Sequence, residues 1–156
     1  MKVGLIQTDI VWGDPEANLQ RAAEAIAAHP GADLYVLPEM FTTGFATQEN
    51  ARLDEDPDRT LAWMKARAAA GDCALAGSVA MSDGGRNVNR FFFVKPDGEV
   101  TYYDKRHLFT YGGERVRFSG GDRRVTVEWR GVRFLILVCY DLRFPVFSRN
   151  RLLPDG

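Results

Sequence analysis

The stretch KVGLIQTDIVWGDPEANLQRAAEAIAAHPGADLYVLPE, residues 2–39, predicts the class of fold. Its two ends, residues 2–7 and 34–39, are almost continuously apolar, which is typical of strands buried on both faces of a parallel sheet. Between them, Asp14 has the side chain of a helix N-cap, and Pro15 suits the first helical position. A strand, a helix and a strand within so short a stretch predict a βαβ unit, and therefore an α/β fold.

The rest of the chain extends this unit into a mixed α/β pattern. Leu61, Met64 and Ala68 fall on one face of a second predicted helix. Further strands are predicted over residues 73–80, 88–95, 100–105, 124–129 and 132–138. Loops are predicted over residues 46–59 and 106–122. Turn sequences join several of the strands into hairpins, and the last strand leads directly to Cys139.

Composition and charge exclude several classes of function. With 156 residues, of which 46% are hydrophobic, the chain is typical of about one globular domain. The 20 basic and 21 acidic residues leave a net charge of −1, without the basic stripe that nucleic acid or an anionic membrane needs. No apolar run approaches the ~18 residues of a membrane span, and the N-terminal stretch is too polar for a signal peptide. We therefore expect a cytoplasmic protein.

The two cysteines, Cys73 and Cys139, stand far apart in the sequence and form no CxxC pair. A disulfide framework or a structural zinc site needs more cysteines at closer spacing. We therefore expect two free thiols. Cys73 begins a predicted buried strand, so the simplest interpretation is that it packs in the core.

Three functional groups follow predicted strands at the point where each strand ends: Glu39, Lys105 and Cys139. In a parallel α/β sheet, ligands bind beyond the carboxyl ends of the strands. Taken singly, a glutamate or lysine at such a point is usually solvated, and a cysteine usually packs as a small hydrophobe. Together they suit thiol chemistry. A thiol with a pKa near ~8.5 needs a carboxylate to accept its proton, and an ammonium stabilises the oxyanion that its attack creates.

Three segments resemble the signature sequences of the nitrilase superfamily of carbon–nitrogen hydrolases: LPEMFTTGF (37–45), YDKRHLF (103–109) and LVCYDLRFP (137–145). The resemblance spans essentially the whole chain, and it implies a nitrilase-like αββα sandwich with mixed sheets. It implies further that Glu39 is the general base, that Lys105 stabilises the oxyanion and that Cys139 is the nucleophile. It implies no metal and no organic cofactor.

Within that superfamily, YDKRHLF and CYDLRFPVFSRN most resemble the omega-amidase branch. These enzymes hydrolyse the side-chain amide of 2-oxo acids, such as 2-oxoglutaramate and 2-oxosuccinamate, through a cysteine thioester. The resemblance implies that Glu114 is a second glutamate that orients the lysine and the attacking water. It also implies that the backbone N–H of Tyr140 is an oxyanion donor and that the protein forms a homodimer.

Other residues near the motifs have open interpretations. Arg143 suits the carboxylate of a 2-oxo acid, or it pairs with Asp141 or caps nearby carbonyls. His107 is the only histidine near the motifs; a Cys–His dyad is conceivable, but we expect a loop residue. Three aromatic residues near the catalytic positions are candidates for the wall of a pocket: Phe41, Phe45 and Phe109.

Two alternatives concern the chain as a whole. Complete members of the superfamily continue well past the cysteine, whereas this sequence stops soon after Cys139, so we expect residues 1–156 to be the N-terminal portion of a longer domain. Residues 148–156 leave room for only one or two helical turns.

The competing functions are of two kinds. The protein is a hydrolase of a nitrile, an N-carbamoyl amine or another amide, or it is an inactive binding module.

Overall fold

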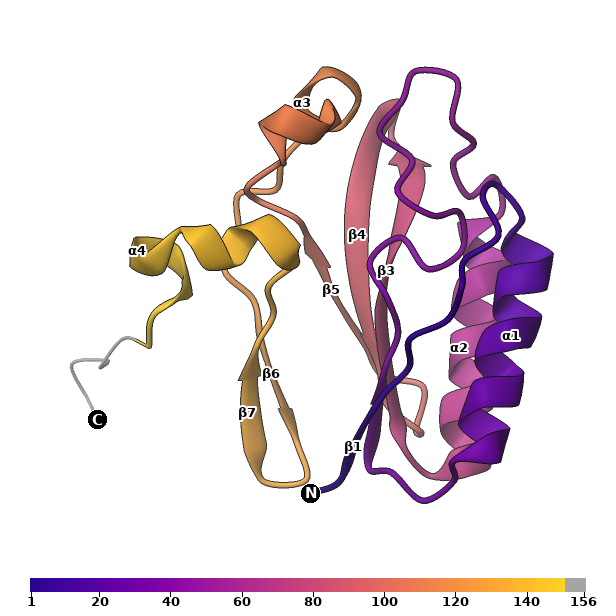
Figure 1. Ribbon diagram of the computed structural model, residues 1–156. Coiled ribbons are helices and arrows are strands. Elements are labelled where there is room, and N and C mark those ends of the chain that lie inside the picture. The colour runs from indigo at the N-terminus through magenta and orange to yellow at the C-terminus, as the bar shows by residue number, and fades with distance from the viewer. Residues whose placement is uncertain (151–156) are drawn as a thin grey trace.

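A five-stranded sheet lies between a pair of helices and a two-stranded hairpin in the computed structural model, which describes residues 1–150 (Figure 1). The strands are β1 (Val3–Leu5), β2 (Leu34–Val36), β3 (Ala74–Asp83), β4 (Arg86–Val94), β5 (Val100–Asp104), β6 (Thr126–Trp129) and β7 (Val132–Leu135). The helices are α1 (Pro15–Ala28), α2 (Pro57–Gly71), α3 (Glu114–Arg117) and α4 (Pro145–Ser148), with 3₁₀ turns η1 (Thr110–Gly112) and η2 (Cys139–Arg143). The predicted mixed α/β fold is confirmed.

The order of strands in the large sheet is β1-β2-β3-β4-β5. β1, β2 and β3 run parallel, which confirms the predicted βαβ unit, and β4 is antiparallel to both of its neighbours. Because two antiparallel steps restore the original direction, β5 runs parallel to β2. The carboxyl ends of β2 and β5 therefore lie at the same edge of the sheet, the edge near α3 in Figure 1.

Each face of the large sheet packs against its own hydrophobic cluster. The cluster between the sheet and the helices α1 and α2 includes Leu19, Met64, Leu75, Val79 and Phe92. The cluster between the sheet and the β6–β7 hairpin includes Leu34, Ala76, Phe93, Tyr103, Val127 and Ile136. Neighbouring residues of one strand enter opposite clusters, because successive side chains of a strand point to opposite faces. Cys73 is buried in the first cluster, so its predicted packing role is confirmed.

Both long helices begin with the same pair of residues. The Asp14 carboxylate accepts a hydrogen bond from the backbone N–H three residues later (3.1 Å), and Pro15 opens α1. Asp56 caps α2 in the same way (3.0 Å), and Pro57 opens it. The loop predicted over residues 46–59 is therefore wrong at its C-terminal end. No helix among residues 1–150 is long and apolar enough to cross a membrane.

Two strands end earlier than predicted, and this affects how the site residues are held. β2 ends at Val36, since Pro38 has no N–H with which to extend the ladder. β7 ends at Leu135, and the residues that follow it pack into the hairpin-side cluster before the chain reaches Cys139. Glu39 and Cys139 consequently lie in turns beyond the strands.

The predicted loop of residues 106–122 contains two short helical turns, η1 and α3. After Cys139 the chain forms η2 and the single turn α4. Of the expected helical turns over residues 148–156, the part from residue 151 onward lies outside the described residues.

Candidate active site

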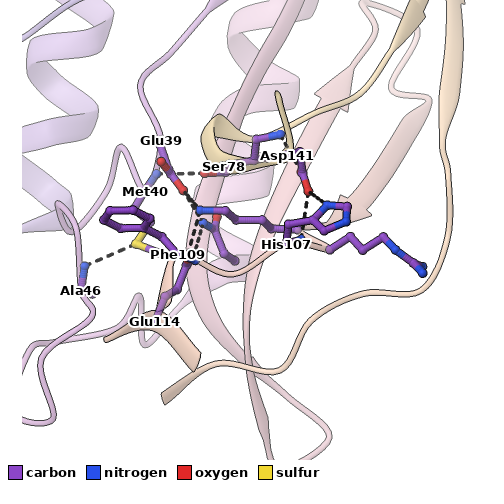
Figure 2. A network of polar contacts seen from close by, with 12 residues as sticks. Glu39, Met40, Ala46, Ser78, His107, Phe109, Glu114 and Asp141 are labelled. Atoms are coloured by element: carbon purple, nitrogen blue, oxygen red, sulfur yellow. Dashed lines mark hydrogen bonds and ion pairs between the residues drawn. The ribbon is translucent and has the colours of Figure 1, made fainter. Parts of the chain in front are cut away.

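Lys105 directly follows β5 and is the central group of the site. Its side chain is fully buried, and its ammonium donates hydrogen bonds of 2.8 Å to Glu39 Oε1 and to Glu114 Oε2 (Figure 2). Desolvation lowers the pKa of Lys105, but the charge of Glu39 and the hydrogen bond to Glu114 outweigh it, so this pKa lies above its ordinary value. The ammonium therefore keeps its charge at neutral pH.

Glu39 lies in the turn after β2, where the backbone adopts an uncommon conformation. The next residue, Met40, has a φ of 49°, in the left-handed region, and its side chain is completely buried. Its N–H donates to Ser78 Oγ at 2.9 Å, and its sulfur accepts from the N–H of Ala46 at 3.3 Å (Figure 2). Such a φ costs about 1–3 kcal/mol, which these contacts offset. The turn places the Glu39 carboxylate against Lys105.

Glu114 opens the four-residue helix α3 and is fully buried. Besides the bond from Lys105, its Oε2 accepts a hydrogen bond of 2.6 Å from the backbone N–H of Phe109. The chain after Lys105 thus folds back, so that the Glu114 carboxylate contacts the Lys105 ammonium. The structure brings Glu114 and Glu39 to opposite ends of one charged network.

Cys139 begins η2, is exposed, and has a φ of 43°. A nucleophile on a sharp, strained turn is a recurrent arrangement in hydrolases. Desolvation of the sulfur and the negative charge of Glu39 raise the pKa of the Cys139 thiol, while the charge of Lys105 lowers it. The net rise keeps the thiol protonated at neutral pH, so its reaction needs a base, and Glu39 is the adjacent one.

Asp141, two residues after Cys139, is fully buried and anchors the turn. Its Oδ1 accepts hydrogen bonds from the backbone N–H and the ring Nδ1 of His107 at 2.9 and 2.7 Å (Figure 2). Its Oδ2 accepts from the hydroxyl of Tyr103 at 2.8 Å and from the N–H of Val138 at 3.0 Å. Burial and the bond to Asp141 raise the pKa of the Tyr103 hydroxyl, which therefore acts only as a donor here.

His107 is occupied by these structural contacts. Its Nδ1 is bonded to Asp141, and its ring stacks on Phe144 with the ring centroids 3.8 Å apart. Among the described residues, no hydrogen bond joins His107 to Cys139. The geometry therefore favours the expected loop role over a Cys–His dyad.

Asn89, in β4, belongs to the site but was not predicted from the sequence. Its Nδ2 donates to Glu39 Oε1 at 2.7 Å and to Glu114 Oε1 at 3.1 Å, and the residue is buried. The available signal was a lone amide in the mostly apolar segment of residues 88–94, at a position that alternates with Phe91 and Phe93 on one buried face. That signal does not say which distant groups the amide meets.

Phe45, Phe109 and Tyr140 are brought together beside the network. A Cβ built on Gly112 would lie 2.7 Å from Phe109 and 3.2 Å from Phe45, so both rings pack on this glycine. The ring of Phe109 also meets that of Tyr140 edge-on, at 5.2 Å between centroids. These three half-buried rings form the aromatic wall of the site. Phe41 is instead buried in the helix-side cluster, so its predicted place in a pocket wall is wrong.

Arg143 is exposed, and within the described residues it makes neither the predicted ion pair with Asp141 nor another hydrogen bond. Four donors already surround the Asp141 carboxylate, which leaves no room for an arginine. A cavity of about 450 Å³ lies next to the site and is lined by Arg106, Arg115 and Tyr140 among others. Neither Glu39, Lys105 nor Cys139 lines it.

The arrangement combines a thiol, two carboxylates and a buried ammonium group. In the part of the chain that the structure describes, no group of three or more histidine, cysteine, aspartate or glutamate side chains is placed to hold a metal ion. The lysine supplies the positive charge of the site. Such a set of groups can attack an acyl carbon, stabilise the resulting oxyanion and transfer protons.

Comparison with known proteins agrees with this chemistry. Residues 2–153 match the carbon–nitrogen hydrolase family model. The chain is 48% identical over 150 residues to the omega-amidase YafV of Escherichia coli K12, covering 96% of this chain and 58% of that protein. It is 34% identical over 154 residues to the 2-oxoglutaramate amidase of Bacillus subtilis, covering 95% of this chain and 59% of that protein.

The fold also matches a solved structure. The protein XC1258 of Xanthomonas campestris, a CN-hydrolase superfamily member with an arsenic adduct in its active site, superposes with a TM-score of 0.85 at 40% identity. The match covers 96% of this chain and 57% of XC1258. The chain thus spans somewhat more than half the length of the relatives that it matches.

Proposed function

This chain belongs to the carbon–nitrogen hydrolase family, and from that premise we propose that it hydrolyses the side-chain amide of small 2-oxo acids, with Cys139 as nucleophile. One observation carries the proposal. The buried Lys105 ammonium donates 2.8 Å hydrogen bonds to both Glu39 and Glu114. The Cys139 thiol lies close enough for the charges of Glu39 and Lys105 to shift its pKa. A base, a cation and a thiol thus meet at one point.

The donors of Lys105 define its role. An ammonium has three N–H groups, and two of them point to Glu39 and Glu114. The third is left for the oxyanion that forms when the thiol attacks. The backbone N–H of Tyr140, in the first turn of η2, is the second proposed oxyanion donor.

In the first half of the reaction, Glu39 takes the proton of the Cys139 thiol while the sulfur attacks the amide carbon. Lys105 and the Tyr140 N–H bind the oxyanion of the tetrahedral intermediate. The carbon–nitrogen bond then breaks as the protonated Glu39 gives its proton to the departing ammonia. A thioester on Cys139 remains.

In the second half, water attacks the thioester. Glu39 accepts a proton from this water, the oxyanion occupies the same donors, and the carbon–sulfur bond breaks as the thiol regains its proton. Glu114 holds Lys105 in place through both halves. The products are ammonia and the dicarboxylic 2-oxo acid, and the enzyme returns to its starting protonation state.

The substrate class rests on the relatives. An omega-amidase and a 2-oxoglutaramate amidase are both among them. The aromatic wall of Phe45, Phe109 and Tyr140 suits a short, flat acyl chain. The exposed position of Arg143 gives no support to the predicted contact with the substrate carboxylate.

The deciding experiment is ammonia release from 2-oxoglutaramate, compared with a nitrile, an N-carbamoyl amine and a simple aliphatic amide. We expect release from 2-oxoglutaramate, its complete loss in Cys139→Ala, and its retention in the matched control Cys73→Ala. If only the nitrile or the carbamoyl amine were hydrolysed, the proposed substrate class would be wrong, whereas the proposed catalytic residues would still stand.

Labelling of the two thiols distinguishes the proposed hydrolase from the alternative, an inactive binding module. A thiol electrophile should label Cys139 much faster than the buried Cys73. Equal and slow labelling of the two, together with no ammonia from any substrate, would favour the module.

Two expectations remain predictions: the homodimer, which the resemblance implies, and the cytoplasmic location, which the composition favours. Light scattering after gel filtration measures the first, and cell fractionation measures the second.

A further inference from the structure

Asn89 is the second side chain that joins the two glutamates. Of the described residues, only Lys105 and Asn89 donate side-chain hydrogen bonds to both Glu39 and Glu114. The backbone N–H of Lys105 also donates to the carbonyl of Asn89 at 3.0 Å, because β4 and β5 are neighbours in the sheet. The two donors therefore sit side by side and hold the carboxylates between them.

The orientation of the Asn89 amide is determined by these contacts. Its NH₂ group has two protons, one for each carboxylate. Turning the amide over would place its oxygen against two negative groups. In the observed orientation, Asn89 Oδ1 has no hydrogen-bond partner among the described residues although it is buried. A buried, unpaired carbonyl costs about 1–3 kcal/mol, which an apolar side chain would avoid, so packing alone does not account for an amide here.

The bonds to Asn89 distinguish the two oxygens of Glu39. Oε1 accepts from both Lys105 and Asn89, whereas Oε2 accepts no hydrogen bond from another described nitrogen or oxygen donor. A base must keep one oxygen available for the proton that it takes. With Oε1 held by two donors, Oε2 is the oxygen available to the Cys139 thiol.

On the basis of the function proposed above, we infer that Asn89 is a positioning residue that holds Glu39 with Oε2 free for the thiol and holds Glu114 on Lys105. Its side-chain hydrogen bonds within the described residues go to the two glutamates, and it acts through them. When Asn89 is replaced, Glu39 and Glu114 are still present, but their carboxylates are no longer held in the required orientation. The effect therefore falls on the chemical step more than on substrate binding.

The test uses Asn89→Leu and Asn89→Asp, with Asn87→Leu and Asn87→Asp as matched controls. Asn87 lies two residues earlier in the same strand, is half-buried, and donates to the carbonyl of Arg117 rather than to a glutamate. We expect kcat for 2-oxoglutaramate to fall at least about 30-fold in Asn89→Leu, with KM changed less than about threefold. Both Asn87 variants keep kcat within about twofold.

Asn89→Asp adds a second measurement, the pH dependence of activity, which would not change if Asn89 only supported the fold. A protonated carboxyl group at position 89 has one O–H to donate, whereas the ionised form adds a third negative charge. The activity of Asn89→Asp relative to wild type therefore rises as the pH falls. An unchanged kcat in Asn89→Leu, equal losses in the Asn87 variants, or a pH-independent ratio for Asn89→Asp would overturn the inference.

A second measurement separates this inference from the proposed function. Asn89→Leu should lower the free energy of unfolding less in a Glu39→Gln background than in the wild type. In that background the hydrogen bond between residues 89 and 39 is already weaker, because the carboxylate has lost its charge. If wild type releases no ammonia from any amide but this coupling is present, the proposed function fails and the contact between Asn89 and Glu39 stands. Equal shifts in the two backgrounds would contradict the coupling.

Discussion

The hydroxyl of Tyr103, two residues before Lys105, donates a hydrogen bond of 2.8 Å to the carboxylate of Asp141, two residues after Cys139. Both side chains are buried, and the residues are 38 positions apart in the sequence. This bond ties the end of β5 to the turn that holds the nucleophile. The hydrogen bond between Tyr103 and Asp141 thus fixes the position of Lys105 relative to Cys139, although neither of these two residues takes part in it.

Asp141→Asn tests this tie. The carboxylate accepts four hydrogen bonds, whereas an amide has one acceptor oxygen and turns its NH₂ toward two of the former donors. We expect a loss of about 1–3 kcal/mol in the free energy of unfolding and a lower kcat. Urea denaturation and ammonia release measure the two effects. The exposed Asp122→Asn is the control, and an equal result for both variants would refute the anchoring role.

Lys105→Met removes the cation from between the two glutamates. Leaving buried charges unpaired costs about 3–5 kcal/mol, and losing an oxyanion donor lowers the rate about 10²–10³-fold. The double variant Lys105→Met with Glu114→Gln should regain part of the stability but none of the activity. Urea denaturation and ammonia release measure both quantities.

Lys95→Met is the control for that experiment. Lys95 forms a 2.9 Å ion pair with Glu99 across the turn between β4 and β5, with side chains 17% and 55% exposed, and pairs at the surface contribute only about 0.2–1 kcal/mol. If Lys105→Met were no more destabilising than Lys95→Met, the buried network would not support the fold as described.

Glu39→Gln should have opposite effects on thiol reactivity and on hydrolysis. The charge of Glu39 raises the pKa of the Cys139 thiol, so its removal lowers this pKa and moves the midpoint of iodoacetamide alkylation to lower pH. Ammonia release falls about 10²–10⁴-fold, because the general base is lost. Peptide mass mapping across a series of pH values gives the midpoint.

Cys73 provides the internal reference for the alkylation experiment. It is 2% exposed, and burial raises the pKa of its thiol, so its alkylation stays slow in both proteins. A Cys139 midpoint that rose or stayed constant in Glu39→Gln would show that the two side chains do not interact as the structure has them.

The residues that we propose to react can be singled out from the sequence because they stand in recognisable local segments. Glu39, Lys105 and Cys139 each follow a predicted strand, and the parallel direction of β2 and β5 then places two of them at one edge of the sheet. The residues that hold them were not predictable. Asn89 meets Glu39 across 50 positions of sequence, and only the register of the sheet decides that meeting.

Two further differences between prediction and structure concern local signals in the sequence. The Asp-Pro pair at residues 14–15 predicts the start of α1, and the same pair at residues 56–57 begins α2, where the polar residues before it and Pro57 instead favour a loop. The sequence leaves Arg143 open between a substrate carboxylate, Asp141 and nearby carbonyls. The other donors around Asp141 come from distant backbone and side-chain groups, which a local segment does not reveal.

The capping interpretation of α2 can be tested quantitatively. Asp56→Ala removes the side chain that accepts the 3.0 Å hydrogen bond at the start of α2, and Asp14→Ala does the same at 3.1 Å for α1. Each should lower the free energy of unfolding by about 0.5–2 kcal/mol without changing ammonia release. Asp58→Ala, in the first turn of α2 but without a capping bond, should lose only about 0.3–1 kcal/mol. Equal losses for Asp56→Ala and Asp58→Ala would mean that charge near the helix end, rather than the cap, stabilises this terminus.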